Sequence, residues 1–216
     1  MAITKIHAIK STLACALNYI ENPDKTLGQL LISGYNVDPQ LAAVDFEMTA
    51  SLARQVNYRG KRSPNLVYHL IQSFAPDDFA PNDPGAYAQA HELGRQLAAQ
   101  YAGGRFEYVV ATHIDQENHI HNHIMINAVS FYDYHRLRTI PYKTTRELRA
   151  ISDRLCTQAG LSVICRTRAA YASAQAVFVL PHHPAHTKHA GTPCGVRRRV
   201  YVFTAAGIQR ISTCSW

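Results

Sequence analysis

The sequence lacks any apolar run of about 18 residues, the length that a membrane-spanning helix needs. Its five cysteines form no CxxC pair, so neither a zinc ribbon nor a disulfide framework is expected. The N-terminal segment MAITKIHAIK has no apolar core of a secretory signal peptide. These absences predict a protein without membrane insertion that stays in the cytoplasm.

Acidic residues are missing from the last part of the chain. All 15 Asp and Glu residues lie in residues 1–153 with 14 of the 22 Lys and Arg residues, whereas residues 154–216 hold the other eight. The net charge of +7 is therefore concentrated at one end of the chain. An argument for DNA binding must rest on a site and on local basic clusters, because the overall charge says little about the folded part.

Hydrophobic periodicity predicts nine elements in the order β-α-β-α-β-α-β-β-α. The expected strands lie near residues 2–10, 27–35, 65–74, 105–113 and 119–129, and the expected helices near residues 12–21, 39–57, 84–102 and 144–160. The two strands near residues 105–129 follow each other as a hairpin, so they are antiparallel. Helices combined with a largely antiparallel sheet are typical of an α+β fold. We therefore expect a central antiparallel sheet that is flanked by helices.

The pattern decays after residue 164. The remaining segment has four histidines within residues 182–189, a triple arginine and scattered apolar residues, with VFVL and YVF as strand-like pieces. We expect a domain over residues 1–164 and a basic, acid-free tail over residues 165–216 that is poorly ordered or loosely attached. One hypothesis is that the tail is an out-of-frame ending on a truncated gene, which an intact reading frame through codon 165 would exclude.

The segment THIDQENHIHNHIMIN, residues 112–127, has the pattern of a β-hairpin that is rich in histidine. Because side chains alternate along a strand, His119, His121 and His123 share one face, and isoleucines point to the other. A five-residue turn would place His113 opposite His119 and diagonal to His121, close enough for two imidazoles to share one ion. Imidazole is the commonest metal ligand in proteins, so we interpret the cluster as a metal site.

Histidines alone do not choose the metal or the reaction. Neutral imidazoles with open coordination positions suit Zn²⁺ in hydrolysis and Mg²⁺ or Mn²⁺ in phosphate chemistry. Asp115, in the turn, is a candidate for orienting a ligand imidazole, and an ordinary turn aspartate is an equal alternative.

One of the twelve tyrosines, Tyr19, stands out by its position on a predicted helix. The apolar stripe of that helix consists of Leu13, Ala16, Leu17 and Ile20. Tyr19 falls about 110° from the centre of the stripe, so it is not an obvious core residue. The pattern by itself favours an exposed tyrosine, since a phenol becomes a nucleophile only with a base or an activated substrate.

Four segments, in order, resemble the relaxase and mobilisation nuclease family of the HUH endonuclease superfamily. NYIENPDKT resembles the first motif, which carries the nucleophilic tyrosine, and VYHLIQSFAPDD resembles the second. HIDQENHIHNHIMINAVS resembles the third, the metal-binding motif, and TTRELRAISDRLCTQAGLSVI resembles the segment that commonly follows. The resemblance covers about residues 5–164 and implies a bacterial mobilisation protein with a HUH-relaxase-like two-layer sandwich.

The resemblance also implies roles for particular residues. Tyr19 would be the nucleophile, and His113, His121 and His123 would hold a divalent ion, with Mg²⁺ or Mn²⁺ expected. The stretch between His113 and His121 is one residue longer than the family pattern, which leaves His119 as a competing ligand. The implied reaction is nicking and rejoining of single-stranded DNA at a transfer origin through a 5′-phosphotyrosyl intermediate. The implied partners are an accessory DNA-binding protein of the relaxosome and a coupling protein.

Further side chains are candidates for contacts around this site. The phosphate-binding candidates are Lys25, Arg59, Lys61 and Arg62, for each of which plain surface charge is the commoner alternative. Tyr68 and His69 are candidates for stacking on bases, although Tyr68 fits a core position equally well. Glu47 is a candidate acid near the metal.

Two other functions remain compatible with the sequence. A metal-dependent phosphodiesterase without a covalent intermediate predicts that Tyr19→Phe retains cleavage and that no protein–DNA adduct forms. An inactive truncated remnant of a relaxase predicts binding of metal without turnover.

Overall fold

The computed structural model describes residues 2–56, 64–80, 82–115 and 119–163, and the backbone of residues 200–204 and 207–211. The chain divides into two compact units, Met1–Ile164 and Cys165–Trp216. Within the described residues, no helix combines the length and the apolar character that crossing a membrane requires.

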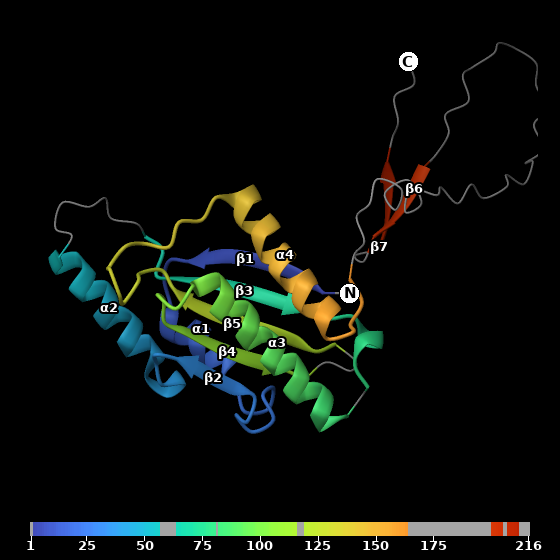
Figure 1. The fold of residues 1–216 in the computed structure, drawn as a ribbon, viewed down its shortest axis with the longest axis horizontal. Helices are drawn as coiled ribbons and strands as arrows, with labels where there is room; N and C mark the ends of the chain where they lie inside the picture. The colour runs from blue at the N-terminus through green and yellow to red at the C-terminus, as the bar shows by residue number, and fades with distance from the viewer. Residues whose placement is uncertain are drawn as a thin grey trace, which may run out of the picture. The chain divides into compact units, whose positions relative to one another are not determined.

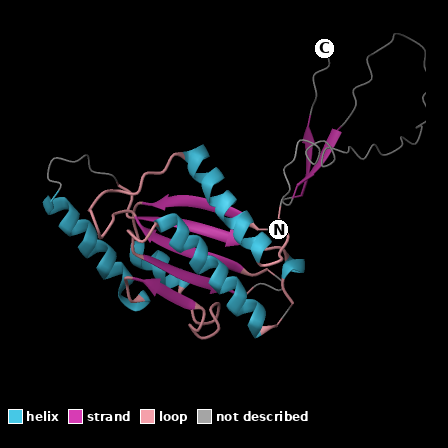
Figure 2. Cartoon of the chain, in the orientation of Figure 1, coloured by secondary structure: helices cyan, strands magenta, loops and turns pink. Residues whose placement is uncertain are grey.

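A five-stranded antiparallel sheet forms the centre of the first unit (Figures 1 and 2). Its strands are β1 (Ile3–Ile9), β2 (Ile32–Tyr35), β3 (Val67–Ser73), β4 (Tyr108–His113) and β5 (His121–Asn127). They lie in the order β1-β3-β5-β4-β2, and each neighbouring pair is antiparallel. β5 is therefore the middle strand, with ladder partners on both sides.

Helices lie on both faces of this sheet. They are α1 (Leu13–Ile20), α2 (Ala42–Val56), α3 (Pro84–Ala102) and α4 (Pro141–Gln158), with short 3₁₀ turns η1 (Pro39–Leu41) and η2 (Pro76–Asp78). Figure 1 shows α3 and α4 side by side across the near face of the sheet, with α1 behind it.

Each face of the sheet has its own hydrophobic core, because successive side chains of β4 and β5 point to opposite faces. The core under α3 and α4 includes Val110, Ile124, Leu97 and Leu148. The core under α1 and α2 includes Val109, Met125, Leu17 and Phe46. The central strands are thus covered on both sides, which holds them in one register.

The order of the elements in the first unit is the predicted one. The predicted α+β sandwich, a central antiparallel sheet flanked by helices, is also confirmed. Hydrophobic periodicity predicts these features well because each long element has a clear apolar stripe or alternation.

The predicted pairing of the histidine hairpin is wrong by two residues. His113 lies opposite His121, and not opposite His119. The pairing of β4 with β5 ends at His113. The next residue, Ile114, donates its N–H to the carbonyl of Lys25 at 3.0 Å. Just before β5, the Ile120 carbonyl accepts from Phe74 N–H at 3.1 Å. Phe74 follows β3, so residue 120 is bonded to the β3 side and not to β4.

The helix ends agree only in part with prediction. Helix α3 begins at Pro84, as predicted, and Asp83 caps it because its Oδ1 accepts from Gly85 N–H at 2.8 Å. The expected start of the last helix near residue 144 is wrong, because α4 begins about one turn earlier at Pro141. Thr144 Oγ1 instead accepts from Ile140 N–H at 2.9 Å, and proline suits the first helical position.

The second unit contains two antiparallel strands, β6 (Val200–Thr204) and β7 (Gly207–Ile211). The strand-like YVF piece coincides with β6. The VFVL piece and most of the segment predicted to be loosely attached lie outside the described residues.

Candidate active site

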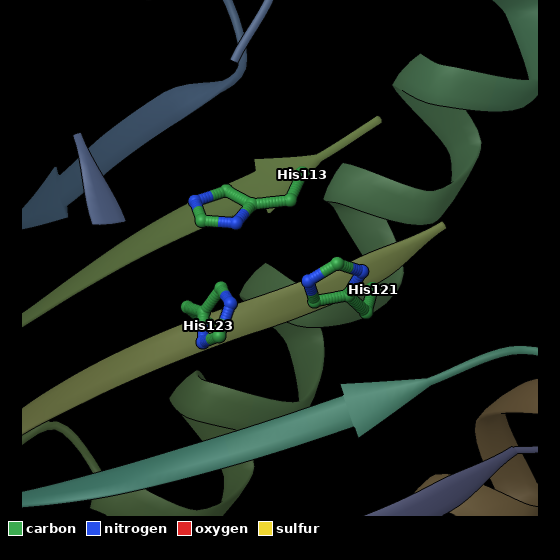
Figure 3. Close-up of side chains that lie close together, drawn as sticks. All are labelled: His113, His121 and His123. Atoms are coloured by element: carbon green, nitrogen blue, oxygen red, sulfur yellow. The ribbon is translucent and has the colours of Figure 1, made fainter. Parts of the chain in front are cut away.

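Three histidines converge where β4 ends and β5 begins (Figure 3). His113 is the last residue of β4, and His121 and His123 are the first and third residues of β5. One ring nitrogen from each of the three lies within 4.8 Å of the others. The cross-strand pairing of His113 with His121 and the two-residue repeat of β5 produce this arrangement.

The other ring nitrogen of each histidine has a hydrogen-bond partner. His113 Nε2 donates to the carbonyl of Ile20 at 2.9 Å, and His121 Nδ1 donates to the carbonyl of His119 at 3.1 Å. His123 Nδ1 bonds to His69 Nε2 at 2.8 Å. His113 Nδ1 and His123 Nε2 are buried with no hydrogen-bond partner among the described residues.

Burial makes all three imidazoles hard to protonate. It lowers the pKa of His113 and of His121, and burial with the neighbouring imidazoles lowers the pKa of His123 to about 2. The cluster is therefore neutral at physiological pH, the state in which imidazole binds metal ions.

These residues fit a divalent metal ion. Two buried nitrogens without partners face a shared space, and a buried polar atom is costly to leave unpaired. Three neutral imidazoles would hold such an ion and would leave it able to take further oxygen ligands from water or substrate.

Tyr19 lies beside the cluster at the end of α1. Its ring centroid is 5.9 Å from that of His113 and 6.0 Å from that of His123. Helix α1 is held there because Leu17 and Ile20 are buried and because the Ile20 carbonyl accepts from His113. The side chain of Tyr19 is 55% exposed, in agreement with its predicted place off the apolar stripe.

Lys25 connects this tyrosine to the turn after β4. Its Nζ lies 4.5 Å from the centroid of the Tyr19 ring and 3.2 Å from Asp115 Oδ2. Asp115 was a candidate for orienting a ligand imidazole, with an ordinary turn aspartate as the equal alternative. The structure agrees with the alternative: the Asp115 carboxylate pairs with Lys25, while backbone carbonyls and His69 occupy the outer nitrogens of the three histidines.

His119, the competing ligand, lies outside the group of three in the described part of the chain. Its ring is 5.4 Å, centroid to centroid, from that of His121, and its backbone carbonyl accepts from His121. The physical reason is the register, which places His113 opposite His121 and leaves His119 before the strand.

The expected roles of Glu47 and His69 need correction, whereas Tyr68 takes the core position that was its alternative. Glu47 is on the exposed side of α2 and is not in the described group of possible metal ligands. Tyr68 is 7% exposed and its hydroxyl accepts from Asn65 Nδ2 at 3.0 Å, so it is a core residue and not a base-stacking surface. His69 is likewise buried, and its ring bonds to the cluster.

The basic residues Arg59, Lys61 and Arg62 lie outside the described residues. Sequence reasoning missed two contributors to the site, the Ile20 carbonyl and His7, whose Nε2 lies 3.1 Å from His69 Nδ1. The only sequence signal for His7 was its place on a strand with alternating side chains. That signal does not show that β3, with His69, is the neighbouring strand.

The central antiparallel sheet thus carries a candidate metal centre of three histidines with an exposed tyrosine beside it. A family model described as "Relaxase: MobA/VirD2-like, nuclease domain" matches residues 19–161. The chain therefore belongs to the MobA/VirD2-like relaxase nuclease domain family.

Two curated relatives are similar to this chain over part of their length. The chain is 32% identical to the group II intron-interrupted relaxase LtrB of Lactococcus lactis, over 68% of this chain and 30% of that protein. It is 31% identical to a protein named rlx of Staphylococcus aureus, over 76% of this chain and 43% of that protein. The chain thus matches less than half the length of these relatives.

Proposed function

We propose that this chain nicks and rejoins one DNA strand at a transfer origin, with Tyr19 as nucleophile, to initiate conjugative mobilisation. The observation that carries the proposal is the position of Tyr19, whose ring lies 5.9 Å from His113 and 6.0 Å from His123 between centroids. Membership of a nuclease domain family supports it.

The proposed metal ligands are His113, His121 and His123, and the proposed ion is Mg²⁺ or Mn²⁺. When bound, a divalent ion supplies polarisation of the scissile phosphate and offsets the charge of the transition state. The protein's part is to keep the three imidazoles neutral and oriented, with two buried nitrogens unpaired for the ion.

Tyr19 would carry the covalent step. Its Oη attacks phosphorus, an Oη–P bond forms, and the bond from phosphorus to the 3′ oxygen breaks. The phenolic proton is lost and the departing 3′ oxygen gains one, so a 3′-OH is released and the 5′-phosphate stays on the enzyme. Attack by a 3′-OH reverses these changes and reseals the strand. The exposure of Tyr19 supports access by an extended single strand.

Among the described residues, Lys25 is the cation that contacts the Tyr19 ring, and we assign it to the DNA backbone. It lies 4.5 Å from the centroid of the Tyr19 ring, where its charge favours a bound phosphate. Arg59, Lys61 and Arg62 remain proposed contacts further along the strand. The proposed setting is the bacterial cytoplasm, with an accessory DNA-binding protein and a coupling protein as partners.

A nicking assay tests the proposal. The purified chain is incubated with an oligonucleotide that carries the transfer origin of its own locus, with Mn²⁺, with Mg²⁺ or with EDTA, and the products are separated on a denaturing gel. We expect a metal-dependent, protein-linked DNA band. Tyr19→Phe removes the nucleophilic oxygen, so cleavage should fall by at least about a thousandfold and the linked band should disappear.

Tyr142→Phe is the matched control, because Tyr142 is 81% exposed on α4, away from the cluster. Cleavage that persists in Tyr19→Phe without an adduct would replace the proposal by a phosphodiesterase without covalent intermediate. A folded chain that binds Mn²⁺ but does not cut would identify an inactive remnant.

A further inference from the structure

Three histidines from three neighbouring strands form a hydrogen-bonded chain that ends at the cluster. His7 on β1 lies opposite His69 on β3, and His7 Nε2 is 3.1 Å from His69 Nδ1. His69 Nε2 is 2.8 Å from Nδ1 of His123 on β5. We propose that His69, with His7 behind it, is the positioning residue that fixes the ring tautomer and orientation of His123 for metal binding. The inference rests on the metal site proposed above.

His123 differs from the other two ligands in the kind of group that holds it. His113 and His121 donate to backbone carbonyls, at 2.9 Å and 3.1 Å. A carbonyl oxygen can only accept, so each of these bonds dictates which ring nitrogen carries the proton. His123 is held by a side chain that either donates or accepts, so its tautomer depends on His69.

The direction of the chain decides whether His123 can bind a cation. A neutral imidazole has one N–H, so two bonds through three rings run either outward or inward. In the outward direction, His123 Nδ1–H donates to His69 Nε2, and His69 Nδ1–H donates to His7 Nε2. This leaves the lone pair of His123 Nε2 free. In the inward direction the proton sits on Nε2, which is buried without a partner and then cannot bind a metal.

The surroundings of the two outer residues favour the outward direction. His7 is exposed on β1, an edge strand, so water can take the hydrogen bond from its second nitrogen. His123 Nε2 is buried and has no acceptor among the described residues, so a proton placed there would be unsatisfied. The chain thus connects the metal ligand to solvent through one buried ring, His69, which is 8% exposed.

A pair of amide variants separates positioning from mere packing. In His69→Gln the side-chain amide reaches the place of Nε2, and its oxygen can accept from His123. In His69→Asn the amide reaches only the place of Nδ1, so the bond to His123 is lost. His69→Leu removes both contacts. His135 is an exposed histidine, so His135→Leu is the control for the loss of one imidazole.

Two measurements on the 216-residue chain read the effect. Calorimetric titration with Mn²⁺ gives the affinity, which should fall about 10- to 100-fold in His69→Asn and His69→Leu and stay within about threefold in His69→Gln. ¹⁵N–¹H correlation spectra of the metal-free protein give the tautomers, with the Nδ1–H form expected for His123 in the native chain and in His69→Gln. Circular dichroism and thermal melts confirm that each variant is folded.

Equal Mn²⁺ affinity in the native chain and in folded His69→Leu would overturn the inference and leave the metal site standing. An Nε2–H tautomer of His123 in the native chain would overturn it as well. Failure of the native chain to bind Mn²⁺ would overturn the proposed metal site instead, and the tautomer of His123 would still decide whether His69 positions it.

Discussion

His119 and His121 are two residues apart, and the sequence leaves His119 as a competitor to His121 for the role of metal ligand. In the structure, the two residues contribute different atoms to the site. His121 contributes a ring nitrogen to the group of three, whereas His119 contributes a backbone carbonyl that accepts from His121. A backbone carbonyl remains after any substitution except one that moves the chain, so the two residues should respond differently to alanine.

We predict that His121→Ala reduces Mn²⁺ affinity by more than about 100-fold, because it removes a direct ligand. His119→Ala should change the affinity by less than about threefold, because it keeps the carbonyl that holds His121. Calorimetric titration of both variants checks this. The reverse order of effects would show that His119 is the ligand and that the register of the hairpin differs in solution.

The side chains that point into the site were predictable, and the atoms that hold them were not. Alternation along β5 indicates that His121 and His123 share a face, and helical periodicity places Tyr19 off the apolar stripe. The contacts of His69 and of the Ile20 carbonyl depend on which strands are neighbours and on where α1 ends against β4. No local pattern contains that information.

Among the elements, α3 and β5 approach each other more closely than side chains normally allow. A Cβ added at Gly94 on α3 would lie 2.5 Å from Asn122 Nδ2 on β5. The Asn122 side chain is fully buried, accepts from Thr112 Oγ1 at 2.6 Å, and donates to the Ala90 carbonyl at 2.8 Å. It has no room to move, so glycine is required at this crossing. Asn122 lies between His121 and His123 in sequence and faces away from them.

We predict that Gly94→Ala lowers the free energy of unfolding by about 1–3 kcal/mol, the usual cost of overpacking. This is opposite in sign to helix propensity, which favours alanine over glycine by about 1 kcal/mol. Ala88→Gly, at an exposed position of the same helix, measures that propensity alone. Urea unfolding of both variants decides the matter, and a more stable Gly94→Ala would show that the close approach is absent.

Element order followed from the sequence, but the register of the central hairpin did not. The predicted turn has five residues, whereas seven residues connect the last ladder pair, because Ile114 N–H donates to the Lys25 carbonyl and not to β5. The hydrogen bond between Ile114 and Lys25 joins distant parts of the chain and competes with a tight local turn. Only the tertiary structure shows that the distant bond forms.

Across the whole of the first unit, a buried polar network links the sheet to the helices α3 and α4 that cover it. His91 Nδ1 donates to Thr112 Oγ1 at 2.8 Å, since the Thr112 proton is given to Asn122 Oδ1. Asn122 Nδ2 donates to Gln72 Oε1 at 3.0 Å, and Gln72 Nε2 donates to Ser152 Oγ at 2.9 Å. The network joins α3, β4, β5, β3 and α4. Loss of one of its hydrogen bonds is therefore expected to affect the packing of all of these elements.

This network makes stability depend on pH. Burial, and then the charge of Arg95, lowers the pKa of His91 from 6.5 to about 4. Between these values the unfolded chain binds a proton that the folded chain does not. The contribution of His91 is therefore fully present above pH 6.5 and is lost as the pH falls toward 4.

We predict that the free energy of unfolding decreases as the pH falls from 6.5 to 4, and that His91→Gln makes this dependence shallower by at most about 1.4 kcal/mol per pH unit. Denaturant unfolding at several pH values measures the slope. His135→Gln, at an exposed histidine, is the matched control, because no buried imidazole is lost. An unchanged slope in His91→Gln would show that His91 does not remain neutral in the folded protein.

The pairing of His113 with His121 has a consequence for how such a site can diversify. The two proposed ligands face each other across a ladder that has β3 on one side and β2 on the other, so the connection between them does not set their distance. Insertions or deletions in that connection are therefore compatible with an unchanged coordination sphere. A related chain with a different connection can therefore keep the same arrangement of the proposed metal ligands.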